Sequence, residues 1–123
     1  MTPDQLFGRL KRFSIDVIFL CRTLRSFPET RIIQNQLIRS ATSAASNYRA
    51  ANCARSKNEW FAKLSVVLEE MDESKFWLDV IDEIKLSTKL DLLQTLCIEA
   101  DKLTRLFSKA RHTAKMKNYQ KKK

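Results

Sequence analysis

Glycine and proline are almost absent from this chain of 123 residues, which contains Gly8, Pro3 and Pro28 and no others of either kind. A β-sandwich or an α/β fold of this length needs many turns, and turns normally use more of both residues. Their scarcity therefore predicts a few long helices with few breaks. The length suits a single domain, and the 44% of apolar and 30% of charged residues suit an ordinary folded protein.

Long apolar runs are absent as well. The longest covers residues 17–21, whereas a membrane-spanning helix needs about 20 apolar residues. The first dozen residues carry charges throughout and lack the apolar segment of a secretion signal. We therefore expect a cytoplasmic protein that does not associate with a membrane.

Histidine occurs once, as His112, and cysteine three times, as Cys21, Cys53 and Cys97. The cysteines lack the close spacing of a zinc or redox site. A di-iron bundle requires Glu-x-x-His pairs on two helices, and a phosphate-binding loop requires several glycines. We expect no metal, no cofactor and no catalytic residues, and we interpret the cysteines as reduced thiols that line the core.

Apolar residues recur at steps of three and four along most of the chain, which predicts four amphipathic helices. We expect these helices over residues 4–25, 30–54, 56–85 and 88–112. Pro28 separates the first two, and Ser56 with Glu59 matches a capping box at the start of the third. Residues 1–112 are thus predicted to form an all-α, antiparallel up-down-up-down four-helix bundle. Residues 113–123 are predicted to form a flexible basic tail.

The second predicted helix is lined with small residues over residues 39–51 rather than with Leu or Ile. Ala and Ser let a neighbouring backbone approach closely, so this stretch predicts a tight helix–helix contact. The residues expected there are Ala41, Ala44, Ala45, Asn47, Tyr48 and Ala51. The Asn47 amide would need hydrogen-bond partners on burial, and Arg49 could reach an acidic residue of the third helix in the same or a neighbouring copy of the chain. We interpret both as structural.

Two of the predicted helices carry more apolar residues than one packing face can use. The surplus residues are Ile15, Ile18 and Phe19 in the first helix and Trp77, Val80 and Ile84 in the third. Excess apolar surface on a small bundle has to be covered, and a second copy of the chain is the simplest cover. These residues are predicted to form a homo-oligomer interface; the alternative is that all of them fit into one core.

The net charge of +9 is distributed unevenly. Residues 1–58 contain ten Lys or Arg and three Asp or Glu, residues 59–101 contain four and eleven, and residues 102–123 contain nine and none. A basic segment without acids is typical of a surface that binds a polyanion, most often nucleic acid. The simpler alternative is a tail that keeps the protein in solution.

The residues expected to contact nucleic acid form two groups. The C-terminal group is Lys109, Arg111, Lys115, Lys117, Lys121, Lys122 and Lys123, and the N-terminal group is Arg9, Lys11 and Arg12. We expect contacts to phosphates as point charges, because no base-reading module is recognisable. A second hypothesis is a scaffold that docks another protein through its acidic third helix or its exposed aromatic residues.

The middle of the chain resembles the bacterial four helix bundle protein family, whose first members are encoded in intervening sequences of large-subunit ribosomal RNA genes. The resemblance rests on RSATSAASNYRAA (39–51), ARSKNEWFAKL (54–64) and EEMDESKFWL (69–78), and it extends over residues 13–107. Many members have Asn-Ile-Ala-Glu-Gly where this chain continues from Asn47 with Tyr-Arg-Ala-Ala. Roles that depend on that Glu therefore do not carry over.

The resemblance implies a homopentamer of antiparallel bundles. It also implies similarity to the accessory proteins of diversity-generating retroelements, which form basic pentameric barrels that engage a reverse transcriptase and nucleic acid. It brings no catalytic residues. The expected function is non-enzymatic binding of nucleic acid, RNA more than DNA, and the alternative is an accessory subunit for a protein such as a reverse transcriptase.

Overall fold

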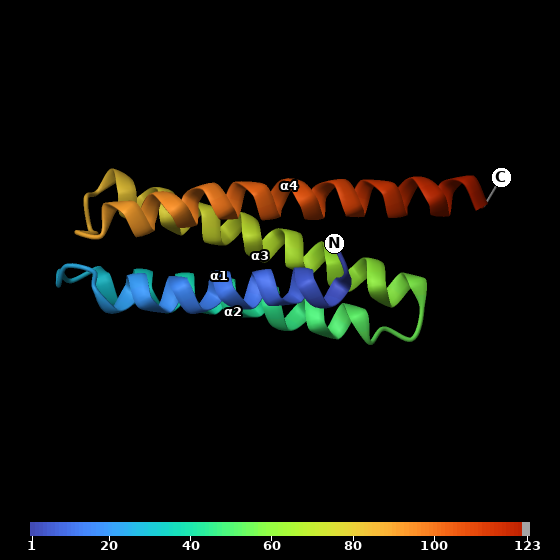
Figure 1. The fold of residues 1–123 in the computed structure, drawn as a ribbon, viewed down its shortest axis with the longest axis horizontal. Helices are drawn as coiled ribbons and strands as arrows, with labels where there is room; N and C mark the ends of the chain where they lie inside the picture. Colours follow the sequence, from blue (N-terminus) through green and yellow to red (C-terminus); the bar gives the residue numbers. More distant parts are fainter. Residues whose placement is uncertain (122–123) are drawn as a thin grey trace.

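Four helices run alternately up and down beside one another in the computed structural model, which describes residues 1–121. They are α1 (Pro3–Arg22), α2 (Thr30–Asn52), α3 (Lys57–Glu83) and α4 (Leu90–Lys121). Each helix packs against the next in sequence, and α4 returns to pack against α1 (Figure 1). The predicted all-α up-down bundle is therefore confirmed.

The largest difference from the predicted elements is the length of α4, which continues to Lys121 instead of ending at residue 112. The segment from residue 113 to Lys121 is thus the end of a helix and not a separate tail. Its apolar pattern has faded, but it contains no Gly or Pro and consists largely of Lys, Ala, Met and Gln, which favour helix. Residues 122–123 lie outside the described residues.

The other helix ends differ from the predicted ones by up to three residues, and local hydrogen bonds account for several of them. α1 starts with a capping box that the sequence reading missed, in which the Gln5 amide donates to Thr2 Oγ1 at 3.1 Å and the Thr2 amide donates to Gln5 Oε1 at 2.9 Å. At the start of α3 the Glu59 amide donates to Ser56 Oγ at 3.1 Å. The Glu59 carboxylate lies 3.6 Å from the guanidinium of Arg55.

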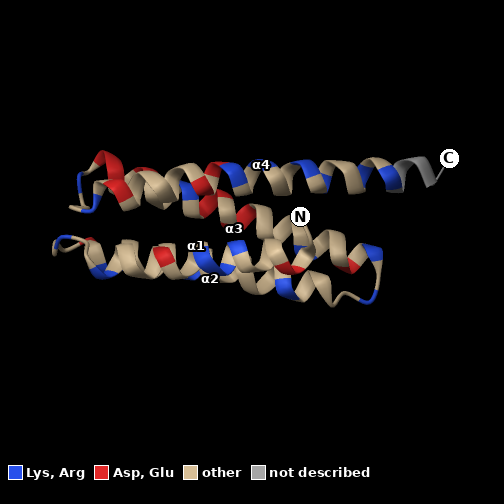
Figure 2. Ribbon diagram, in the orientation of Figure 1, with Lys and Arg blue, Asp and Glu red and all other residues tan. Residues whose placement is uncertain are grey.

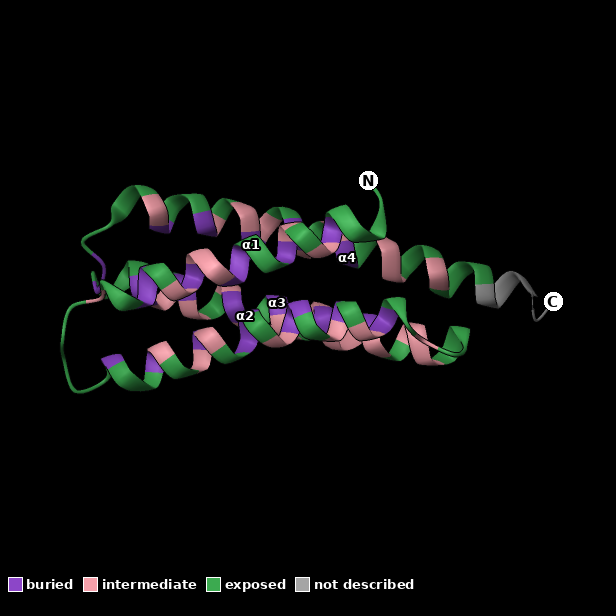
Figure 3. Ribbon diagram, turned by 60° about the horizontal axis from the view of Figure 1, so that its bottom comes forward, coloured by how far each residue is buried: buried purple, intermediate pink, exposed green. Residues whose placement is uncertain are grey.

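The core lies between the inward faces of all four helices, as the buried residues in Figure 3 show. Its largest fully buried side chains include Phe13, Leu37, Met71 and Phe107. The Tyr48 and Phe107 rings meet edge to face, with centroids 5.3 Å apart. Burial of such side chains is the main favourable term in folding.

The small residues of α2 lie where its neighbours come closest. Ser14 Oγ on α1 donates to the Ala41 carbonyl oxygen at 2.9 Å. On the other side of α2, the hydroxyl oxygens of Ser40 and Ser74 are 2.8 Å apart and both serines are buried. Side-chain to backbone contact across a helix pair requires small side chains at the interface.

The residues predicted for this tight contact are mostly buried. Ala41, Ala44, Ala45, Tyr48 and Ala51 all have less than a tenth of their surface exposed. Asn47 is half-buried, and its Nδ2 donates within α2 to the Ser43 carbonyl oxygen at 2.9 Å. Asn47 therefore satisfies its amide locally and does not join two helices.

Within one chain, the ion pairs that the structure shows between α2 and α3 come from Arg39 and not from Arg49, and a pair of Arg49 with a neighbouring copy stays a prediction. Arg39 Nη1 lies 2.8 Å from Glu70 Oε2, and Arg39 Nη2 pairs with Glu73. Arg49 is exposed. Arg39 therefore links α2 to the acidic helix, and it lies nearly three turns before Arg49.

Candidate nucleic-acid interface at the open end of the bundle

The last part of α4 extends past the start of α1. Arg9 of α1 pairs with Glu99 of α4, and the two helices are antiparallel. Because α1 begins six residues before Arg9, at Pro3, its first residue is level with about residue 105 of α4. From there to Lys121, α4 has no α1 beside it (Figure 1). We call this part of the molecule the open end.

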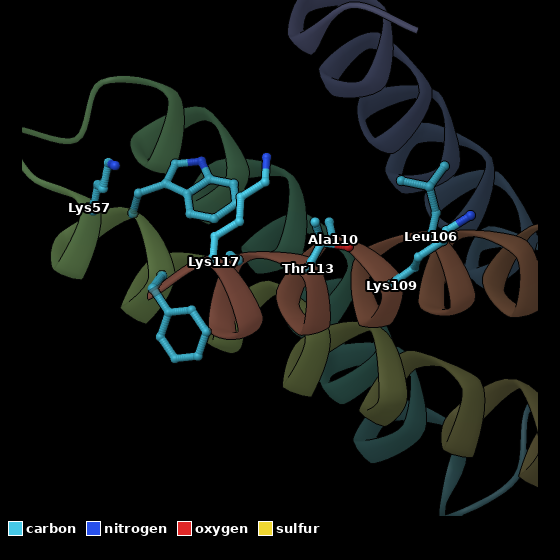
Figure 4. A pocket seen from close by; sticks show the side chains of 9 residues that line it. Lys57, Leu106, Lys109, Ala110, Thr113 and Lys117 are labelled. Atoms are coloured by element: carbon cyan, nitrogen blue, oxygen red, sulfur yellow. The ribbon is translucent and has the colours of Figure 1, made fainter. Parts of the chain in front are cut away.

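A pocket of about 630 Å³ occupies the open end. From α3 it is lined by Lys57, Trp60 and Phe61, and from α4 by Leu106, Lys109, Ala110, Thr113, Ala114 and Lys117. The labelled α4 side chains lie on one side of that helix in Figure 4. This is the side on which Glu99 meets α1, so the pocket lies where a longer α1 would continue.

The two aromatic residues of the pocket differ in their neighbours. Phe61 has the guanidinium of Arg111 over its ring, with 5.0 Å between the guanidinium carbon and the ring centroid. Arg111 Nε also donates to Ser65 Oγ at 3.0 Å. Trp60 is half-buried and packs against the core. Arg111, predicted to contact phosphate, is thus held against α3 by a stacking contact and a hydrogen bond.

The predicted lysines of the C-terminal group occupy different faces of α4. Lys109 and Lys117 are exposed and line the pocket. Lys115 is also exposed, but it lies about 200° around the helix axis from Lys117, and so it faces away from the pocket. The Lys121 side chain, and the whole of Lys122 and Lys123, lie outside what the structure describes.

The predicted N-terminal group is largely engaged within the molecule. Arg9 donates two hydrogen bonds to the Glu99 carboxylate, at 2.8 and 2.7 Å, and this contact raises the pKa of Arg9. Arg12 pairs with Asp16 one turn away, at 2.5 Å. Lys11 is exposed. Arg9 and Arg12 therefore form ion pairs within the chain, and their contact with nucleic acid stays a prediction.

Acidic and basic residues are separated along the bundle. Figure 2 shows the Asp and Glu residues concentrated toward the α3–α4 connection and Lys and Arg along the far part of α4. Among the acids, Asp101 pairs with Lys75 at 2.6 Å, and this hydrogen bond lowers the pKa of Asp101. The open end therefore combines positive charge with apolar surface.

The cysteines differ in their surroundings, and the described residues include no candidate metal site. Among them, no group of three His, Cys, Asp or Glu residues could hold a metal ion. Burial raises the pKa of the Cys21 thiol to about 12. The pKa of the Cys97 thiol is also raised, mainly by burial and to a lesser degree by nearby carboxylates. Cys53 is exposed, so the prediction that all three cysteines line the core is wrong for Cys53.

The residues predicted for an oligomer interface are partly exposed. Phe19 and Ile84 have 45% and 47% of their surface exposed, so the alternative that all six fit into one core is wrong. Ile15, Ile18, Trp77 and Val80 are half-buried. Phe76, beside Trp77, is 56% exposed. No helix within residues 1–121 is long and apolar enough to cross a membrane.

The fold is similar to that of a protein of unknown function from the S23 ribosomal protein family of Bacteroides thetaiotaomicron, known from a crystal structure at 1.70 Å resolution. The two structures agree with a TM-score of 0.76 and 20% sequence identity, over 91% of this chain and 99% of the other. The resemblance noted in the sequence is thus confirmed at the level of the fold. No protein-family model and no curated protein matches the chain.

Proposed function

We propose that this chain, which has the fold of an S23 ribosomal protein family member, is a non-enzymatic, homo-oligomeric protein that binds nucleic acid through the open end of its bundle. The observation that carries the proposal is the charge of residues 102–123, which hold nine Lys or Arg and no Asp or Glu. Such a segment attracts phosphates over a distance and holds them by counterion release.

RNA is the preferred polyanion in this proposal. The structural relative comes from a family named for a ribosomal protein, and the sequence resembles proteins encoded within ribosomal RNA genes. Lys109, Lys115 and Lys117 project from α4 as exposed point charges. Point charges contact phosphates without reading the base sequence, so we expect weak sequence preference.

Self-association would multiply the number of basic ends that one nucleic acid can reach. The partly exposed residues Phe19, Phe76 and Ile84 supply apolar surface for contact between copies. Several linked binding ends raise the overall affinity without any new contact. A pentamer is the state that the family resemblance implies.

Filter binding of labelled RNA across a salt series tests the proposal. If three to five phosphates are neutralised, the association constant should fall about tenfold or more between 50 and 200 mM salt. Light scattering with and without RNA would give the mass of the assembly. Absent binding at low salt, or binding that does not change with salt, would contradict the proposal.

A second candidate function is docking of another protein, such as a reverse transcriptase. The observation that favours it is the exposed ring of Phe76, which meets Trp77 edge to face at 4.9 Å and lies on the acidic helix near Asp72 and Asp79. Exposed aromatic residues are enriched at protein interfaces. A pull-down that recovers only nucleic acid, released by nuclease, would count against this function.

A further inference from the structure

We infer that the pocket at the open end accepts an unpaired base of the bound nucleic acid, while lysines at its rim hold the adjoining phosphates. The inference rests on the proposed function and deepens it. It makes the protein selective for single strands, which the basic surface alone would not do.

The size and the lining of the pocket suit a small planar occupant. Its volume of about 630 Å³ lies within the range of pockets that hold compact ligands, about 300–1,000 Å³. Trp60 supplies aromatic surface in its α3 wall, and Phe61 lies next to it with Arg111 over its ring. Stacking on aromatic side chains is the usual way in which proteins hold single-stranded bases.

The α4 wall is made of small residues where a closed bundle would need large ones. Ala110, Thr113 and Ala114 follow Phe107 and Leu103, which are fully buried. Without α1 opposite them, these short side chains leave a hollow. The small residues that follow the large ones along α4 therefore leave space for a ligand.

The charge around the pocket suits a nucleic-acid strand. Lys109 and Lys117 lie eight residues apart on α4, about 12 Å along its axis, with the small residues between them. The residues that line the pocket include no Asp or Glu. A base between the two lysines would have cations on both sides for its neighbouring phosphates.

A helix from another protein fits this site less well. Helix-in-groove binding uses anchors at i, i+3, i+4 and i+7, and so needs a groove about two turns long on both walls. The α3 wall extends over residues 57–61, which is about one turn. The basic end of α4 from a second copy would in addition bring like charges together.

Trp60 fluorescence tests the inference directly. The chain has two tryptophans, Trp60 and Trp77, so Trp77→Phe leaves Trp60 as the reporter. A ten-nucleotide single-stranded RNA should quench Trp60 emission over the concentrations at which filter binding shows complex formation. A duplex of the same sequence, and an abasic strand of the same length and charge, should bind without quenching, and the abasic strand about tenfold more weakly than the intact one.

A pocket-filling variant gives a second, independent readout. Ala114→Leu adds an apolar side chain inside the pocket, and it should weaken single-strand binding about tenfold while leaving duplex binding unchanged. Ala62→Leu, an exposed α3 position that does not line the pocket, is the matched control and should change neither.

The outcomes separate the inference from the proposed function. RNA binding without quenching, or equal binding of intact and abasic strands, overturns the base pocket and leaves the basic surface in place. Failure to bind any nucleic acid overturns both. Trp60 emission that changes with protein concentration alone would mean that another copy fills the pocket, and this also overturns the inference.

Discussion

The two ends of the bundle are built in contrasting ways. At the end where α1 connects to α2 and α3 connects to α4, the loops are tied together. The Arg25 amide donates to the Leu86 carbonyl oxygen at 2.9 Å, Gln34 Nε2 donates to the Cys21 carbonyl oxygen at 2.7 Å, and Leu86 is buried. At the open end, α4 extends past α1 and lines a pocket together with the start of α3. The loops of the closed end are joined by hydrogen bonds, whereas the open end exposes apolar and cationic side chains.

Alanine shows the same contrast within single helices. Ala41 and Ala44 are fully buried because neighbouring helices approach α2 closely. Ala110 and Ala114 are half-buried and line a pocket because α1 does not extend opposite them. The same residue type therefore marks close packing in one region and a cavity in the other.

The largest loss of stability is expected from removing the Phe107 ring, which lies at the end of the core next to the pocket. Phe107 is fully buried against Tyr48, and Phe107→Ala should lower the free energy of unfolding by about 3–5 kcal/mol. Urea denaturation measures this loss. Phe27→Ala, at a loop position that is 52% exposed, should cost less than about 0.5 kcal/mol. Equal losses would show that the core does not reach Phe107.

Two substitutions of Ala by Leu, one at a closely packed position and one in the pocket, test the difference between the two regions. Ala44→Leu forces extra volume between close helices and should destabilise the protein by about 1–3 kcal/mol. Ala114→Leu enters an existing pocket and should change stability by less than about 0.5 kcal/mol. Denaturant midpoints of both variants give the answer. A similar loss at both positions would contradict the distinction between closed and open regions.

The smallest loss of stability is expected from breaking the ion pair between Arg9 and Glu99, which fixes the position of α1 along α4. The Arg9 and Glu99 side chains are 26% and 27% exposed, and Glu99→Gln should cost about 1 kcal/mol. Asp16→Asn removes the one-turn pair with Arg12, whose guanidinium is mostly exposed, and should cost about half as much or less. Thermal melts of the two variants would compare them, and the reverse order would argue against this anchoring role.

Much of the fold was predictable because it depends on local patterns. The apolar spacing indicated four helices, and the Ala and Ser residues around Ala44 marked the close contact. The end of α4 was missed because its apolar pattern fades while its helix-favouring residues continue to Lys121. Helix propensity, added over the last ten residues, was the signal that could have found it.

The pocket was not predictable, because it depends on how far α1 reaches along α4. That register is set by contacts such as Arg9 with Glu99, ninety positions apart in sequence. Trp60 falls on the apolar spacing of α3, and that spacing alone would place it in the core rather than in a pocket. Arg111 was predicted from its charge to contact phosphate, and its stacking on Phe61 could not be foreseen from the sequence. The number of Lys and Arg residues in a segment shows where positive charge is concentrated. It does not show which of these residues make contacts within the molecule.

The most direct test of the account compares two triple variants that remove the same charge. Lys109, Lys115 and Lys117 change to Gln at the open end in one, and Arg25, Arg31 and Lys89 change to Gln at the closed end in the other; all six side chains are exposed. RNA affinity is measured by filter binding at 50 mM salt. We expect a loss of tenfold or more for the open-end variant and a much smaller loss for the closed-end variant. Equal losses would mean that net charge alone drives binding, and would contradict the assignment of binding to the open end.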